Sequence, residues 1–278
     1  MKVILSRKGF DSVNGGCPSP ILPDGTMLSL PIPDDEGVEY EELSYRGIPY
    51  SDLLFQLNPR KEYKKCHLDP DIRENIRRND IASWKPALGQ IGSSQGLLSN
   101  AKVEIGDLFL FFGWFRQVEQ IQGKYRYKRK KAADFYHGSD LHVIYGYMQI
   151  GDILHDPARI KSYYWHPHSA FDRLENASNT LYIPSETLSF LPEYKGYGVL
   201  SFQENRVLTM IDQNRGTWKD LRFLRPQHIY GNKKNAAKGS GLYYSGIWQE
   251  LVVFESEGLM EWAKSVICPA DQVILHSR

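Results

Sequence analysis

Two apolar segments near the middle of the chain constrain its fold most strongly. Residues 103–115 carry a Gly-Asp turn followed by Leu108–Phe112, a short run that is both apolar and aromatic. Leu141–Ile150 is a second apolar, β-rich run, in which Gly146 marks a bulge or a close backbone approach. Runs of this length and composition favour buried strands. We therefore expect residues 103–153 to form the strand-rich centre of the fold.

Weaker signals on both sides add short elements around this centre. Val3–Leu5 favours a first strand, and prolines and glycines exclude a helix from the segment that follows it. Further strands are expected at Met27–Leu30, Gly47–Pro49, Thr180–Ile183, Val199–Phe202 and Gln249–Phe254, with a hairpin over Val118–Tyr127 that turns at Gln122-Gly123. Short helices are expected at Ser51–Leu57, Asp71–Arg78, Trp84–Leu98 and Leu259–Val266.

These elements predict an α+β protein with a mainly antiparallel sheet or a small β-barrel and short peripheral helices. We expect residues 1–278 to form a single domain, with the barrel core around residues 100–155. With 41% hydrophobic and 24% charged residues, the composition is that of an ordinary globular protein. The net charge of +1 excludes a globally basic nucleic-acid binder, although it leaves room for a local basic patch.

The compartment is inferred from cysteine usage and from apolar run length. The three cysteines are widely spaced and odd in number, which favours reduced thiols over a disulfide framework. The N-terminal apolar run is too short for a signal peptide, and no run approaches the length that spans a membrane. We therefore expect a cytoplasmic protein with no membrane partner.

A cluster of charged residues and glycines follows the first expected strand. Arg7 and Lys8 are suited to neutralising phosphate, and the nearby Gly15-Gly16 backbone offers N–H groups to an anion. Asp11 is a candidate catalytic base or ligand. Alternatively, the segment is a turn in which the arginine and the aspartate pair with each other. Walker spacing is absent, so the segment is not a P-loop.

Histidines and aspartates are concentrated in two other places. In the segment CHLDPDIR, His67 is a candidate general acid or base oriented by Asp69, although aspartates here could instead cap a following helix. His166 and His168 lie two residues apart, a spacing that can chelate a metal ion or contact a nucleotide, and that also suits a purely structural role. Because no motif supplies a third ligand, we predict no metal site.

Basic and aromatic residues near the centre suggest contacts with nucleic acid. A basic hairpin with interleaved tyrosines suits phosphate contacts plus base stacking, or is simply a solvated turn. The residues expected to contact a nucleic-acid backbone are Lys128, Arg129 and Lys130. Trp114 and Tyr145 are candidates to sandwich a flipped base, unless they belong to the core. Gln249 could read a base edge from the start of its strand, or be an exposed strand end.

Five segments, in chain order, resemble the bacterial and phage family called nucleotide modification associated domain 3. They are SRKGFDS, GGCPSPILPDGTMLSLPIPD, CHLDPDIR, GDLFLFFGWFR and LHVIYGYMQIGDI, and the similarity runs from Ile4 to about Ile267. The family name reflects an inferred association with systems that hypermodify DNA bases, without an established reaction. The central strands are also similar to barrels of the PUA, ASCH and EVE superfamily, several of which hold RNA or an extruded base in an aromatic pocket.

The resemblance implies a protein that recognises or modifies a base in nucleic acid, with DNA or a nucleotide as its partner. A non-catalytic reader of modified bases and an enzyme acting on free nucleotides are the alternatives. The density of titratable groups favours an enzyme. The catalytic candidates are then Asp11, His67 and Asp69, and the nucleotide-binding candidates are Arg7, Lys8, Trp114, Tyr145, His166, His168 and Gln249. The sequence indicates no particular cofactor, reaction or oligomeric state.

Overall fold

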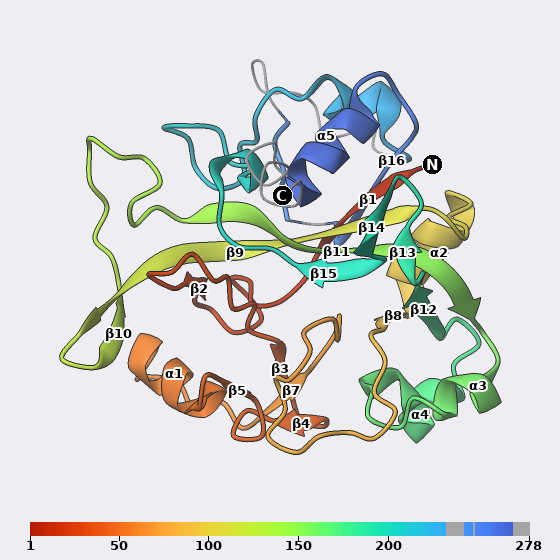
Figure 1. Cartoon of the computed structure of the whole chain (residues 1–278), viewed down its shortest axis with the longest axis horizontal. Helices are drawn as coiled ribbons and strands as arrows, with labels where there is room; N and C mark the ends of the chain where they lie inside the picture. The colour runs from red at the N-terminus through yellow and green to blue at the C-terminus, as the bar shows by residue number, and fades with distance from the viewer. Residues whose placement is uncertain (232–241, 247, 269–278) are drawn as a thin grey trace.

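A computed structural model describes residues 1–231, 242–246 and 248–268. Its main feature is a curled, open, mixed sheet, which runs across the middle of the molecule (Figure 1). In spatial order its strands are β16 (Glu250–Val253), β1 (Val3–Arg7), β9 (Leu108–Ile121), β11 (Leu141–Leu154), β12 (Thr180–Pro184) and β8 (Leu88–Gln90). Three more strands join it: β2 (Ser19–Ile21) and β10 (Lys124–Tyr127) pair with β9, and β15 (Tyr197–Val199) pairs with β11.

The two long strands β9 and β11 form the centre, as their apolar runs predicted. They pair antiparallel from Phe115 opposite Leu141 to Leu108 opposite Gln149. The register shifts beside Gly146, where a side chain would lie 2.6 Å from Ile72 Cδ1, so the predicted bulge and close approach are both present. Every side chain from Leu108 to Phe112 is buried.

The direction of pairing differs from the prediction. β1 and β2 both run parallel to β9, so the sheet is mixed, although its other pairings are antiparallel as expected. Among the described residues the strand order ends at β16 on one side and β8 on the other, so the sheet is a curled half-barrel and not the closed small barrel that was the second expectation. The apolar patterns predict where strands lie in the sequence. They do not predict which strands pair, because pairing depends on contacts between distant segments.

Five α-helices lie around the sheet, within the described part of the chain: α1 (Tyr50–Leu57), α2 (Gly92–Asn100), α3 (Pro157–Lys161), α4 (Phe171–Leu174) and α5 (Leu259–Ile267). Short 3-10 turns occupy Pro167–Ser169, Glu204–Arg206, Arg222–Leu224 and Pro226–His228. The remaining strands are β3 (Ile32–Asp34), β4 (Val38–Glu39), β5 (Ser44–Tyr45), β6 (Ile48–Pro49), β7 (Lys65–His67), β13 (Thr187–Leu188) and β14 (Leu191–Lys195). The fold is therefore α+β, with more strand than helix. None of the described helices is long and apolar enough to cross a membrane.

Several local predictions fail where tertiary contacts override the sequence pattern. The segment 71–78 is not helical, because Asp71 pairs with the backbone of Ala87 and its carboxylate binds Arg77 and Trp84. The expected helix 84–98 divides into strand β8 and helix α2. The segment 27–30 makes a single bridge instead of a strand, and the strand expected at 199–202 ends at Val199. The hairpin at Gln122-Gly123 is confirmed, and both residues have the positive φ that such a turn requires.

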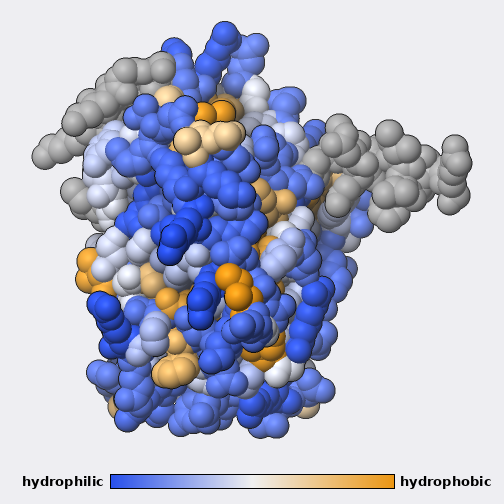
Figure 2. All heavy atoms as spheres, turned by 90° about the vertical axis from the view of Figure 1, so that its left-hand side faces the viewer, coloured by the Kyte–Doolittle hydropathy of each residue, from blue (hydrophilic) through white to orange (hydrophobic). Residues whose placement is uncertain are grey.

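The core has one large part on the sheet and a smaller part under the N-terminal segment. Aromatic residues of β9 and apolar residues of α5 belong to the large part, whereas Phe10, Tyr40 and helix α1 build the smaller one. In Figure 1, α5 lies above the sheet and α1 lies below it. The face that carries α1 and β10 is mostly hydrophilic, with small separate hydrophobic groups (Figure 2). The predicted nucleotide-binding residues Arg7 and Lys8 lie at the end of β1 and directly after it, where the chain leaves the sheet.

One buried histidine connects β11 to the segment above the sheet. His142 is enclosed by aromatic rings, and its Nδ1 accepts a 3.0 Å hydrogen bond from Trp218 Nε1. Burial lowers the pKa of His142 to about 3. The ring is therefore neutral in the folded protein at pH values where an exposed histidine, with a pKa of about 6.5, is already charged.

We predict that His142 makes the protein less stable in weak acid. The unfolded chain gains a proton on this residue near pH 6.5 and the folded chain does not, so its contribution is complete above that pH and is lost as the pH falls. His142→Gln keeps an acceptor for Trp218 but does not titrate. Urea unfolding between pH 7 and 4.5 should show a smaller loss of unfolding free energy in this variant. An equal pH dependence in both proteins would contradict the prediction.

Candidate functional site

A pocket of about 260 Å³ opens where strand β1 ends, beside the ends of β7 and β8. It brings together seven of the residues predicted from the sequence: Arg7, Lys8, Asp11, His67, Asp69, His168 and Gln249. These residues come from four separate segments of the chain, so their convergence is a result of the tertiary structure. Asp34 and Arg173, which the sequence did not single out, also line the pocket.

A buried lysine between two carboxylates forms the floor of this site. Lys8 Nζ lies 3.5 Å from Asp69 Oδ2 and 3.8 Å from Glu250 Oε1, and all three side chains are buried. Glu250 Oε1 also accepts hydrogen bonds from Ser6 Oγ (3.0 Å) and Gln90 Nε2 (2.6 Å). Burial raises the pKa of Glu250 even though Lys8 opposes the shift. Glu250 follows the predicted Gln249 directly in the sequence.

Asp69 is the carboxylate on which the site is centred. Its Oδ1 accepts the backbone N–H of Gly89 at 2.7 Å and lies 3.3 Å from His166 Nε2. Burial alone would raise the pKa of Asp69, but the charge of Lys8 and the contact with His166 hold it well below its usual range. No helix follows Asp69, so it is not the helix cap that the sequence also allowed. It is an ionised carboxylate inside the protein.

His67 and His168 present neutral imidazoles next to Asp69. His67 ends strand β7, with its Nδ1 3.4 Å from Asp34 Oδ2 and its Nε2 4.0 Å from Asp69 Oδ2. His168 lies on the 3-10 turn Pro167–Ser169, and its Nδ1 is 2.7 Å from Asn179 Oδ1. Burial lowers the pKa of His67 to about 4 and that of His168 to about 3. Both rings are therefore neutral at neutral pH, and each has a nitrogen lone pair that can bind a metal ion.

His166 does not act as a pair with His168. Its Nδ1 accepts the backbone N–H of His168 at 3.2 Å, and its ring packs behind Asp69, away from the pocket lining. The 3-10 turn thus gives the two histidines different partners, although their ring centroids remain 5.5 Å apart. His166 has the role of a buried support for Asp69.

Gly89 allows this close packing. A Cβ atom on Gly89 would lie 2.1 Å from Cδ2 of the His168 ring, so any side chain there would displace the histidine. The Gly89 N–H group also binds Asp69. One glycine of the buried strand β8 therefore sets the positions of two pocket residues. This role could not be predicted, because nothing near Gly89 in the sequence marks it as a contact point.

At the entrance, Arg7 and Asp11 form an ion pair of 2.9 Å. Asp11 also accepts the backbone N–H groups of Val13 and Asn14, which makes it the centre of a turn. Burial opposes these contacts, but together they lower the pKa of Asp11. This is the internally paired turn that we considered as the alternative reading. Gln249 lies beside it, with its backbone carbonyl accepting the Arg7 N–H (2.8 Å).

The two aromatic candidates line separate cavities and do not form a sandwich. Trp114 borders a second pocket of about 290 Å³, which shares Arg7 and Asp11 with the first, and the Arg215 guanidinium covers its ring at 3.9 Å. Tyr145 is buried in the core and reaches only a small cavity of about 30 Å³ behind Asp69. The burial of Tyr145 agrees with the alternative that it belongs to the core.

The basic residues Lys128, Arg129 and Lys130 follow strand β10 and line none of the pockets described here. Arg129 and Lys130 are exposed, whereas the Lys128 carbonyl accepts a hydrogen bond from Arg116. In Figure 1, β10 lies at the far left of the sheet, while β8 and α4 beside the pocket lie to the right. A nucleic acid would therefore have to be long to contact both the basic residues after β10 and the pocket.

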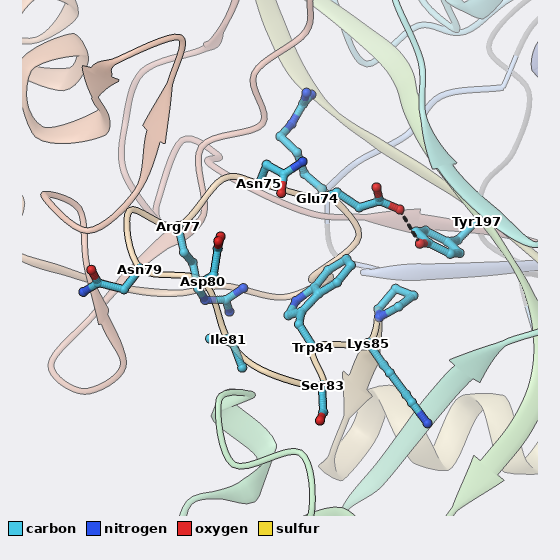
Figure 3. A pocket seen from close by; sticks show the side chains of 12 residues that line it. Glu74, Asn75, Arg77, Asn79, Asp80, Ile81, Ser83, Trp84, Lys85 and Tyr197 are labelled. Atoms are coloured by element: carbon cyan, nitrogen blue, oxygen red, sulfur yellow. Dashed lines mark hydrogen bonds between the residues drawn. The ribbon is translucent and has the colours of Figure 1, made fainter.

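A larger cavity lies elsewhere, and its charged side chains are engaged with one another. It measures about 550 Å³ and is lined mainly by the loop 73–86 (Figure 3). Glu74 accepts hydrogen bonds from the Tyr197 hydroxyl (2.6 Å) and Lys195 (2.7 Å), and Arg77 binds Asp71. Because Glu74 and Arg77 already have hydrogen-bond and ion-pair partners within the protein, we place the functional site at the pocket of about 260 Å³.

A family model called nucleotide modification associated domain 3 matches residues 2–253. The chain belongs to this family. The match includes every residue of the pocket and confirms the resemblance seen in the sequence. Separate comparisons with curated proteins and with solved structures found no match. Membership in the family associates the chain with nucleotide modification, and the PUA-like detail of the earlier resemblance receives no support from these comparisons.

We predict that the buried lysine is important for folding stability. Lys8→Met keeps the side-chain length but leaves Asp69 and Glu250 without their cation, and losing one partner of a buried pair costs about 3 kcal/mol or more. The exposed pair of Arg46 and Asp24 provides the control, since Arg46→Met should cost less than about 1 kcal/mol. Urea unfolding at pH 7 measures both. Equal effects of the two substitutions would refute the buried ion-pair assignment.

Proposed function

We propose that this protein is an enzyme of nucleotide modification that acts on a nucleotide, or on a base in nucleic acid, in the pocket at the end of strand β1. The observation that carries the proposal is the contact between ionised Asp69 and the neutral ring of His67, beside a cationic opening. Buried titratable groups with pKa values shifted in one cleft are typical of catalytic sites. Membership in the family supplies the substrate class.

The opening provides the charge needed to hold a phosphate group. Arg173 lines the pocket, and among the described residues it makes no ion pair or side-chain hydrogen bond. Arg7 lies on the same pocket and is only partly compensated by Asp11. Guanidinium groups suit phosphate because their paired N–H donors match its oxygens. We therefore assign Arg173 and Arg7 to substrate binding.

His67 is the best candidate for the general base. The contact of its Nδ1 with Asp34 favours the tautomer with a proton on Nδ1, which leaves Nε2 free to accept one. Asp69, near Nε2, stabilises the charged ring that this transfer produces. Asp69 therefore has a supporting role rather than that of a base, since Lys8 and the Gly89 N–H already engage its two oxygens. Asp11 remains a weaker candidate because its carboxylate is engaged in the turn.

A non-catalytic reader is the second candidate, and the described pocket favours it less. A reader of flipped bases would need an open aromatic surface. Here Arg215 covers Trp114, and Tyr145 is buried. The pocket instead contains two histidines, several carboxylates and cations, which is more titratable chemistry than recognition requires.

We predict that substrate binding and turnover depend on different residues. Arg173→Gln should weaken the binding of a deoxynucleoside monophosphate at least about tenfold, because a charged hydrogen bond contributes about 1.5–3 kcal/mol. His67→Gln should leave this binding within about threefold and abolish any conversion of the bound nucleotide. Arg46→Gln, on an exposed pair away from the pocket, is the matched control. Isothermal titration calorimetry measures binding, and mass spectrometry of the nucleotide measures conversion. Arg173→Gln behaving like Arg46→Gln would contradict the assignment.

We predict that the basic residues 128–130 contribute to binding only if the substrate is a nucleic-acid polymer and not a free nucleotide. If DNA is the substrate, replacing Lys128, Arg129 and Lys130 with glutamine should weaken oligonucleotide binding and reduce its salt dependence, because fewer counterions are released. Binding of the mononucleotide should not change. Removing three exposed charges elsewhere, with Arg60, Lys64 and Lys102 replaced, controls for net charge. Fluorescence anisotropy at several salt concentrations measures both. Equal oligonucleotide affinity in the two triple variants would remove the polymer from the proposal.

A further inference from the structure

The pocket contains three side chains with metal-donor atoms whose proximity was not predicted from the sequence. One ligand atom from each of His67, Asp69 and His168 lies within 4.8 Å of the others. The three residues come from β7, the loop after it and the 3-10 turn Pro167–Ser169. Two imidazoles and one carboxylate are a common donor set for divalent first-row transition metals.

The ring of His168 is oriented with its free nitrogen available. The Asn179 Nδ2 group donates to the His168 carbonyl at 3.0 Å, which fixes the amide so that its Oδ1 faces the ring. His168 Nδ1 must then donate its proton to this oxygen, and Nε2 carries the lone pair. A hydrogen bond of this kind on the second ring nitrogen is typical of histidines that bind metal ions.

His67 repeats the arrangement with a carboxylate. Its Nδ1 lies 3.4 Å from Asp34 Oδ2, so the proton is held on that side, and its Nε2 points towards Asp69 Oδ2 at 4.0 Å. The Gly89 N–H binds the other oxygen, Oδ1, and this leaves Oδ2 turned to the histidine. Gly89 also lies directly against His168, where a Cβ would be 2.4 Å from Nε2. The three donors are therefore oriented by groups that belong to the fold.

We propose that His67, Asp69 and His168 bind one divalent first-row transition-metal ion, whose other coordination positions face the pocket. Lys8 shares Asp69 Oδ2 at 3.5 Å, and the nearby Glu250 offsets the repulsion between the two cations. Since metal–ligand distances are about 2.0–2.2 Å, small rotations of the three side chains must close the site around the ion. The inference deepens the proposed function, on which it rests for the idea that a nucleotide enters the same pocket beside the ion.

The test uses the full chain, stripped with EDTA and titrated with cobalt(II) while its visible absorption is recorded. One equivalent should produce a saturable d–d band, and zinc(II) should displace it. His67→Gln and His168→Gln should each weaken cobalt binding at least about 100-fold, whereas His155→Gln, which replaces an exposed histidine outside the pocket, should not. Circular dichroism of each variant verifies folding. A missing band, or a band unchanged in both pocket variants, would overturn the proposal.

Asn179 provides a second, independent readout as a positioning residue. Asn179→Ala removes the acceptor from His168 Nδ1 and should weaken cobalt binding about 10- to 100-fold, while Asn179→Asp keeps an acceptor and should restore most of it. Equal losses in both variants would contradict this orientation of the ring. Mononucleotide binding, measured with and without cobalt, separates the two proposals. Cobalt binding without nucleotide binding refutes the proposed function alone, and nucleotide binding without cobalt binding refutes the metal site alone.

Discussion

Lys8 lies buried between Asp69 and Glu250, and this contact ties together three segments that are far apart in the chain. Lys8 follows β1, Asp69 follows β7, and Glu250 begins β16, which pairs with β1 at Ser6. Without the lysine, two carboxylates would be buried close to each other, a situation that proteins avoid because desolvation and repulsion add. The pocket exists because the chain brings one cation and two acids into the same desolvated place.

The histidines can remain neutral because this charge is already balanced. Asp69 has Lys8 and the Gly89 N–H as partners, so it does not need a protonated histidine to be stable. Burial then lowers the pKa values of His67 and His168 without strong opposition. Neutral rings beside an ionised carboxylate are suited both to proton transfer and to metal binding, which share the requirement for a free lone pair on nitrogen. The two proposals for this pocket therefore depend on one electrostatic arrangement.

The sequence predicted those parts of the structure that depend on local pattern. The apolar runs of β9 and β11 and the turn at Gln122-Gly123 were found because composition and backbone preference define them within a few residues. The parallel pairing of β1 with β9 was missed, because strand neighbours are chosen by contacts over a hundred residues apart. The same division holds for the site. Local motifs revealed Lys8 and His67, whereas Glu250, Arg173 and Gly89 acquire their roles only through residues distant in sequence.

The two histidines at 166 and 168 illustrate why spacing alone can mislead. Read as an extended segment, they form a chelating pair that lacks a third ligand. In the folded chain His166 accepts the backbone N–H of His168 and contacts Asp69 Oδ1, whereas a ring nitrogen of His168 lies close to His67 and Asp69. One ring supports the carboxylate from behind, and the other joins His67 at the pocket. The pair of His166 and His168 expected from spacing is thus replaced by a group of three residues from distant segments, His67, Asp69 and His168. Asp69 makes this possible because it contacts His166 through Oδ1 and lies near His67 through Oδ2.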